Sequence, residues 1–281
     1  MKIVIIGGTG LIGKKLTSIL SAAGHEAIPA SPSSGVNTLT GEGLAAAFTG
    51  ADVVVDVSNS PSFAPDEVMA FFSTSANNVA AAEKAAGVKH HVALSVVGTN
   101  RMDSGYMKAK IAQEKIIAGS GIPYTILRAT QFYEFLPAIG DFSTVDGVVH
   151  LPPVHMQPLA AADVSAELAR IAEAAPVNGI VEVAGPEKLT IAEFVQRALA
   201  AKKDPRKIVA DPGSTYFGAR VDDQQDRLSG LKAKRSSMSD RAPWTLQEAC
   251  PSLKVQESCQ SPFHDEPHKI PLLQIFRNLR H

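Results

Sequence analysis

Residues 1–16 read MKIVIIGGTGLIGKKL, and this stretch decides the fold. The four apolar residues at 3–6 are bounded by glycine, which is typical of a strand buried on both faces of a parallel sheet. Apolar residues then recur at helical spacing up to position 23, and Gly24 follows where a left-handed residue would end a helix. The stretch therefore predicts a strand, a tight turn and a helix.

Three evenly spaced glycines mark the turn. In a dinucleotide-binding turn the first glycine makes the bend, the second lets a ligand approach the backbone, and the third lets helix and strand pack closely. The free N–H groups at the start of the helix favour phosphate. We therefore predict a dinucleotide site, the alternative being a structural turn in another kind of α/β protein. The residues assigned to it are Gly7, Thr9, Gly10, Leu11, Ile12 and Gly13.

Length and composition restrict the class of protein. A chain of 281 residues with 45% apolar residues can form one large α/β domain, alone or with appendages. A formal net charge of −1 indicates neither a basic nucleic-acid face nor a polybasic membrane patch. No apolar run reaches membrane-spanning length, and no signal sequence is recognisable. We expect a soluble cytoplasmic protein whose partner is a small molecule, without nucleic acid or membrane.

Short apolar runs and amphipathic runs alternate along most of the chain. This alternation predicts the α/β class, with a Rossmann-type doubly wound parallel sheet and ligands at the carboxyl ends of its strands. Further strands are expected at residues 26–29, 52–57, 91–95, 124–128, 148–151, 156–159 and 179–183. Helices are expected at residues 41–48, 65–86, 105–118, 161–174 and 190–201, the last with a capping box of Thr190 and Glu193.

The loops after the second and third strands complete the predicted cofactor site. A site for NAD usually carries a carboxylate about 20 residues past the glycines, but residues 30–35 read ASPSSG. Serine hydroxyls together with a nearby lysine suit a 2′-phosphate, which favours NADP over NAD; a plain Ser/Pro turn is the alternative. The residues added to the site are Ser31, Ser33, Ser34, Ser58 and Asn59, with Lys14 or Lys15 nearby.

Tyr106 and Lys110 stand four residues apart on one predicted helix, so their side chains leave the same face. Tyrosine is a poor acid–base catalyst at neutral pH, and a neighbouring cation lowers its pKa. This helix follows the strand at 91–95, so it begins at the edge where ligands bind. The pair predicts a catalytic or cofactor contact, the alternative being a solvated pair on the helix surface.

Together with the glycine turn, several motifs resemble the atypical short-chain dehydrogenase/reductases, particularly their NmrA-like NAD(P)-binding branch. They are Ser95 within HVALSVVG, Tyr106-x-x-x-Lys110, and VAGPE at residues 183–187. The resemblance extends from residue 1 to about residue 220. It implies that Tyr106 is the general acid/base, that Lys110 binds the nicotinamide ribose, and that Ser95 binds the substrate oxygen. Val96 is the alternative match for that serine.

The resemblance also implies a small C-terminal lobe that covers the substrate, formed mainly by residues 129–160 and 179–220. Residues 129–136 read ATQFYEFL, which suits a small apolar or aromatic substrate oriented by Thr130 or Gln131. Aromatic residues at this spacing also suit simple core packing, which is the alternative.

The chain becomes polar and irregular from residue 221 onward. We expect residues 221–281 to be a divergent or frame-shifted, poorly ordered tail. This stretch holds Cys250, Cys259, His264 and His268, but the cysteine spacing is unusual for zinc, so we expect no metal site.

These observations predict an NAD(P)-dependent oxidoreductase that transfers hydride from the nicotinamide to a carbonyl- or quinone-like molecule. The resemblance includes reductases of quinones, flavins or aromatic compounds. It also includes regulators that bind the cofactor without turnover, so the alternative is a sensor that signals through a protein partner. A sugar-nucleotide epimerase or dehydratase is a third possibility, disfavoured because the loops lack an arginine cluster.

Overall fold

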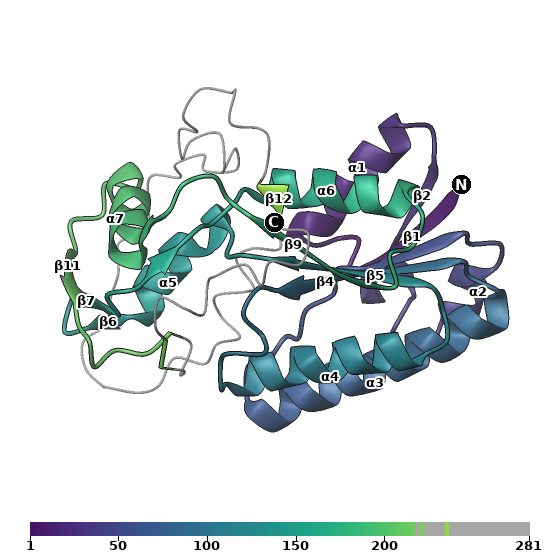
Figure 1. Ribbon diagram of the computed structural model, residues 1–281, viewed down its shortest axis with the longest axis horizontal. Helices are drawn as coiled ribbons and strands as arrows, with labels where there is room; N and C mark the ends of the chain where they lie inside the picture. Colours follow the sequence, from purple (N-terminus) through teal and green to yellow (C-terminus); the bar gives the residue numbers. More distant parts are fainter. Residues whose placement is uncertain (217–219, 222–233, 236–281) are drawn as a thin grey trace.

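Seven parallel strands form the central sheet (Figure 1). The computed structural model describes residues 1–216, 220–221 and 234–235. In spatial order the strands are β2 (Glu26–Ala30), β1 (Lys2–Ile6), β3 (Val53–Asp56), β4 (His90–Val96), β5 (Tyr124–Ala129), β9 (Gly179–Ala184) and β12 (Lys234–Arg235). The strand order reverses between β1 and β3, the point at which doubly wound sheets bind ligands. The predicted fold class is confirmed.

Helices cover both faces of this sheet (Figure 1). One face carries α1 (Leu11–Ala22) and α6 (Ala161–Glu173), and the other carries α2 (Leu44–Phe48), α3 (Pro65–Ala86) and α4 (Gly105–Gly119). Side chains of β1 alternate between the two cores: Ile3 and Ile5 pack toward α1 and α6, whereas Val4 and Ile6 pack toward α2 and α3. This two-sided burial explains the unbroken apolar run.

Two expected elements differ in length. Helix α2 starts at Leu44, three residues later than expected, because Gly41 and Gly43 have positive φ angles of 80° and 74° that no α-helix accommodates. The strand expected at 156–159 is reduced to β8 (His155–Met156), and Leu159 forms only an isolated bridge with Phe132.

A smaller lobe lies beyond the carboxyl end of the sheet, at the left of Figure 1. Its elements are α5 (Leu136–Phe142), β6 (Thr144–Val145), β7 (Val148–Leu151), β8, β10 (Leu189–Thr190), α7 (Ile191–Ala201) and β11 (Lys207–Ala210). It has an apolar core of its own, in which Phe194 is 2% exposed and Val195 is fully buried. The expected capping box of α7 is present. Sequence patterns missed α5, β6, β10 and β11, which are short.

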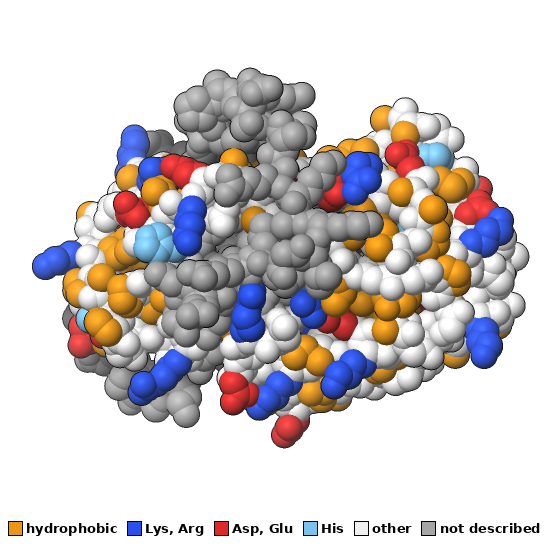
Figure 2. All heavy atoms as spheres, in the orientation of Figure 1, with side chains coloured by type: hydrophobic (Ala, Val, Ile, Leu, Met, Phe, Trp, Pro, Cys, Tyr) orange, Lys and Arg blue, Asp and Glu red, His pale blue; other side chains and the backbone are white. Residues whose placement is uncertain are grey.

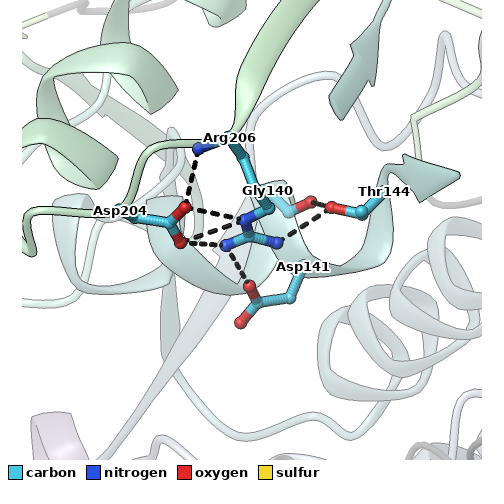
Figure 3. A network of polar contacts seen from close by, with 5 residues as sticks. All are labelled: Gly140, Asp141, Thr144, Asp204 and Arg206. Carbon is cyan, nitrogen blue, oxygen red and sulfur yellow. Dashed lines mark hydrogen bonds and ion pairs between the residues drawn. The ribbon is translucent and has the colours of Figure 1, made fainter. Parts of the chain in front are cut away.

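A network centred on Arg206 joins the segment before β11 to α5 and β6 (Figure 3). Its guanidinium donates to Asp204 at 2.6 Å, to Asp141 at 2.7 Å and to Thr144 at 2.9 Å. These two carboxylates raise the pKa of Arg206. The lobe is therefore held together by charged hydrogen bonds at one side as well as by its core.

Among the residues whose placement is described, no helix has both the length and the apolar character needed to cross a bilayer. Figure 2 shows acidic and basic side chains interspersed over the described part of one face. Residues 234–235, within the tail expected to be poorly ordered, form β12 of the central sheet; apart from these and residue 221, that tail lies outside the described residues.

Two adjacent buried histidines at the start of β4 point to opposite faces of the sheet. His90 Nε2 shares a hydrogen bond of 3.0 Å with Thr125, and His91 Nδ1 shares one of 2.6 Å with Glu83 of α3. Burial lowers the pKa of His90 to about 4. Burial also opposes a charge on His91, but Glu83 outweighs it and raises the pKa of that ring.

His90 is expected to make the fold sensitive to acid. Between about pH 6.5 and pH 4 the unfolded chain protonates this ring while the folded protein does not, so stability is lost as the pH falls. His90→Gln keeps a partner for Thr125 and should lose about 2 kcal/mol less stability over that interval. Urea unfolding at the two ends of the interval measures this. Equal losses in both proteins would show that His90 does not titrate as inferred.

Candidate functional site

Three glycines of the turn between β1 and α1 have no room for a side chain. Gly7 has a φ of 76°, and a Cβ atom there would lie 2.9 Å from the backbone nitrogen of Ser58. A Cβ on Gly13 would collide with the carbonyl oxygen of Gly7. Gly8 is equally restricted, since a Cβ there would lie 2.5 Å from Cα of Pro29. Sequence reasoning missed Gly8, although the glycine pair at 7–8 was a visible signal.

The open side of the turn is at Gly10, the N-cap residue of α1. Gly10 is exposed, has an ordinary φ of −81° and supplies no side-chain cap to the helix. Its neighbours Thr9 and Leu11 are exposed as well, whereas Ile12 is buried and packs in the core. An uncapped helix N-terminus with a small, exposed glycine fits a diphosphate, because its N–H groups lack protein partners from side chains.

The serines after β2 bind one another. Ser31 and Ser34 form a capping box around the 3₁₀ turn Pro32–Ser34, and the hydroxyls of Ser31 and Ser33 lie 2.9 Å apart. This arrangement fits the alternative of a self-contained turn, and the assignment to a 2′-phosphate remains a prediction. Strand β2 ends at Ala30 and is followed by the serine turn, so no carboxylate stands at the end of this strand to bind a ribose 2′-OH.

The loop after β3 connects to α4 through Asn59. Asp56, the last residue of β3, accepts hydrogen bonds from the N–H and the hydroxyl of Ser58 at 2.9 and 2.6 Å. Asn59 Oδ1 accepts from the Tyr106 hydroxyl at 3.1 Å and from the N–H of Ser60 at 3.0 Å. The structure therefore brings Tyr106 to Asn59, the neighbour of Ser58, and the assignment of these three residues to a cofactor or catalytic site stays a prediction. Asp56 was missed, although it ends the apolar run VVVD.

Tyr106 lies in the first turn of α4 among aromatic rings. Its ring stacks on Phe63 at 5.4 Å between centroids and meets the edge of Phe72 at 5.9 Å. Burial raises the pKa of Tyr106. The expected lowering of this pKa by Lys110 is therefore not found, because apolar surroundings disfavour the phenolate and hold the group as a neutral phenol.

Lys110 is 3% exposed and points into the interface between α4 and the sheet. Its Nζ donates to the carbonyl of Leu94 at 2.9 Å and to Gln113 Oε1 at 2.5 Å, and it lies 4.4 Å from the centre of the Phe72 ring. Burial lowers the pKa of Lys110 to about 8, although nearby carboxylates oppose this shift. Tyr106 and Lys110 share one helix face, but the hydrogen bonds of the ammonium go elsewhere.

Ser95 faces α4 and is 3% exposed. Its hydroxyl donates to Glu114 Oε1 at 2.5 Å, and the same carboxylate receives two hydrogen bonds from Arg128 at 3.0 and 2.6 Å. Glu182 lies 3.8 Å from the other side of that guanidinium. Ser95 therefore does not present its hydroxyl to a substrate, contrary to the expectation, and it has no part in the catalytic set proposed below. This buried network was not visible in the sequence.

Side chains of the loop at 129–136 mostly pack against the protein and do not line an open site. The hydroxyl of Thr130 donates to the carbonyl of Gln157 at 2.6 Å, and Tyr133 meets Phe194 in the lobe core at 5.9 Å. Thr130 is 2% exposed, so it is not the orienting group expected for a substrate. Gln131 is half-buried, and its assignment stays a prediction. The alternative of core packing accounts for much of this loop.

The described residues offer no metal centre. Within the described ranges, no group of three or more His, Cys, Asp or Glu side chains is placed to hold a metal ion. The cysteines and histidines considered for zinc lie outside the described residues.

Comparisons with known proteins agree with a dinucleotide site. The family described as NAD(P)H-binding matches residues 7–174, more than half of the chain. A curated (4-alkanoyl-5-oxo-2,5-dihydrofuran-3-yl)methyl phosphate reductase of Streptomyces griseus is 30% identical over 144 residues. That match covers 46% of this chain and 48% of the reductase, so the chain spans about half the length of the curated relative it matches.

Two solved structures share the fold and contain dinucleotides. One is an NADPH-dependent quinone oxidoreductase of Escherichia coli with NADPH: 24% identity, TM-score 0.58, covering 75% of this chain and 78% of that one. The other is a UDP-glucose 4-epimerase of Thermus thermophilus with NAD: 18% identity, TM-score 0.61, covering 76% and 88%. The same architecture therefore carries either dinucleotide.

Proposed function

Because the chain belongs to the NAD(P)H-binding family, we propose that it is an oxidoreductase acting on a carbonyl- or quinone-like small molecule. The bound dinucleotide would supply the hydride. The observation that carries the proposal is the meeting of Tyr106 with Asn59 at 3.1 Å, at the carboxyl edge of the sheet. This edge also holds the open glycine turn, so a proton donor and a dinucleotide site share one end of the protein.

The residues of the chain have separate tasks in this proposal. The N-terminus of α1 binds the diphosphate through its N–H groups at Gly10 and beyond. Asn59 orients the hydroxyl of Tyr106, and Tyr106 holds the proton that the substrate oxygen receives. Burial raises its pKa, so the group is a protonated phenol at neutral pH and does not act as a base, although the same shift makes it a weaker acid than free tyrosine.

The surroundings of Tyr106 suggest the substrate class. Phe63, which is half-buried, stacks on its ring, so the hydroxyl stands beside one partly exposed aromatic side chain; Phe72 is fully buried and only supports the ring of Tyr106 from within. An aromatic or quinone-like molecule matches such a side chain through stacking. The names of the Streptomyces reductase and the Escherichia coli quinone oxidoreductase support reduction as the reaction class.

A second function is favoured by a specific observation. Lys110 and Ser95 are buried and bonded to other protein groups, so two of the three expected catalytic side chains do not face the site. A regulator that binds NAD(P) and signals to a protein partner needs no such set. We therefore keep the sensor as the alternative to the enzyme.

Mixing the protein with NADPH and a simple quinone distinguishes these functions. We expect the absorbance of the reduced nicotinamide to fall at an initial rate proportional to the protein concentration. Tight NADPH binding by calorimetry without turnover over a panel of quinones and aromatic aldehydes would instead favour the sensor.

NADPH should bind at least as tightly as NADH, because β2 ends without a carboxylate that would repel a 2′-phosphate. Ser33→Asp places a carboxylate on an exposed position of the serine turn. It should weaken NADPH binding about tenfold relative to NADH, since one close pair of like charges costs about 1 kcal/mol or more. Calorimetric titration of both dinucleotides measures the ratio. A parental protein that clearly prefers NADH would show that the ribose pocket lies elsewhere.

A further inference from the structure

A chain of hydrogen bonds joins the Ser58 loop to Lys110 through two buried side chains. Asp56 is 2% exposed and Gln113 is 1% exposed. Gln113 Nε2 donates to Asp56 Oδ2 at 3.0 Å, and Lys110 Nζ donates to Gln113 Oε1 at 2.5 Å. The neutral amide of Gln113 therefore stands between a buried carboxylate and a buried amine.

The amide of Gln113 has one favourable orientation. If it were reversed, its oxygen would face the carboxylate of Asp56 and its NH₂ group would face the amine of Lys110, so both contacts would be repulsive. Asp56 is itself fixed, because its Oδ1 already accepts two hydrogen bonds from Ser58. The acceptor oxygen of Gln113 is consequently held toward Lys110.

The other groups around Lys110 are less adjustable than this amide. The carbonyl of Leu94 belongs to the backbone of β4, and the ring of Phe72 is fully buried on α3. The carboxylates that favour a charge on Lys110 are Asp56 on β3 and Glu114 on α4 itself. Glu114 is engaged by Ser95 and Arg128, as described above.

We propose that Gln113 is the positioning residue for Lys110, with Asp56 holding its amide so that the ammonium keeps a fixed place beneath the Ser58 loop. This inference rests on the proposed function, in which the Ser58 loop belongs to the predicted dinucleotide site; Lys110 does not face that site and is joined to the loop only through Gln113 and Asp56. Through Asp56, one hydrogen-bonded unit links a loop of the cofactor site to the buried ammonium. Neither contact was foreseen from the sequence.

Two substitutions of opposite effect test the proposal. Gln113→Met keeps the length of the side chain and removes the acceptor, so the ammonium loses a partner and its pKa should fall below the parental value of about 8. Gln113→Glu keeps an acceptor oxygen and adds a negative charge, so the pKa of Lys110 should rise above the parental value. Lys115→Met, at an exposed position of the same helix, is the matched control.

The pKa of Lys110 can be read without any turnover, from carbon NMR of protein labelled at the lysine ε-carbon. The signal is assigned by its absence in Lys110→Arg. In the quinone assay Gln113→Met should lower kcat/KM by roughly 10- to 100-fold, as expected when the Ser58 loop of the predicted cofactor site is misplaced by about 1 Å, and Gln113→Glu should recover part of the loss. The control should match the parent in both measurements.

A Lys110 signal that titrates at the parental midpoint in both Gln113 variants would overturn the proposal. So would midpoints that shift in the same direction, since that would indicate general loosening of the interface. If the parental protein reduces no acceptor, the oxidoreductase proposal fails, yet the NMR titration still decides whether Gln113 positions Lys110. Should Gln113→Met not fold, the upward shift in Gln113→Glu decides alone.

Discussion

Replacing Tyr106 with phenylalanine should lower kcat for quinone reduction by about 10²- to 10⁴-fold, the usual loss when a general acid is removed. The ring contacts with Phe63 and Phe72 survive, because only the hydroxyl and its bond to Asn59 disappear. The dissociation constant for NADPH should therefore change little. Stopped-flow turnover and calorimetric binding measure the two quantities separately.

The matched control is Tyr124→Phe, which removes the same atom at the first residue of β5, the end of that strand away from the carboxyl edge of the sheet. It should retain the parental rate. If Tyr106→Phe also reduces the quinone at the parental rate, no proton comes from this phenol. Hydride transfer would then need no acid from the protein, or the sensor function would apply.

Replacing Gly10 with valine should weaken dinucleotide binding by at least about 100-fold while the protein stays folded. Backbone hydrogen bonds to a charged ligand contribute about 1.5–3 kcal/mol each, and a branched side chain at this N-cap would keep the diphosphate away from at least two. The fold should be strained only slightly, because a Cβ on Gly10 would make one tight contact, 3.3 Å to the carbonyl oxygen of Gly7, which a shift of a few tenths of an ångström relieves.

Two other glycines give the contrast. Gly119→Val adds the same atoms where a Cβ would meet nothing within 4 Å, so it should bind NADPH like the parent. Gly13→Val should instead destabilise the fold, because its Cβ would collide with the backbone of the glycine turn. Calorimetry and thermal unfolding separate these results. Undiminished NADPH affinity in a folded Gly10→Val protein would exclude this turn as the diphosphate site.

Local patterns determined the architecture of this chain. The apolar runs that became β1 and β3 are buried on both faces, and such burial requires side chains that are apolar at every position rather than at alternate ones. The glycine turn was equally readable, because close backbone packing at Gly13 excludes every other residue. The match of residues 7–174 to the NAD(P)H-binding family agrees with these features.

Only part of the candidate site could be predicted from the sequence. That Tyr106 and Lys110 share a helix face follows from their spacing, but the environment on that face does not. In the tertiary structure Tyr106 is buried among aromatic rings, and this burial raises its pKa. The ammonium of Lys110 donates its hydrogen bonds to Leu94 and Gln113. The expected lowering of the Tyr106 pKa by Lys110 depended on the direction in which the ammonium points, and residue spacing alone does not specify that direction.

The sequence by itself determined which loops reach the carboxyl edge of the sheet, because the position of each strand and of the loop that follows it can be predicted from local periodicity. Only the tertiary structure decided which side chains there are exposed and which are bonded inward. Ser95 is the clearest case, since its hydroxyl binds Glu114, nineteen residues away. Glu114 in turn binds Arg128 of β5. A buried polar group must find a partner wherever packing supplies one, and that partner belongs to the fold rather than to the local pattern.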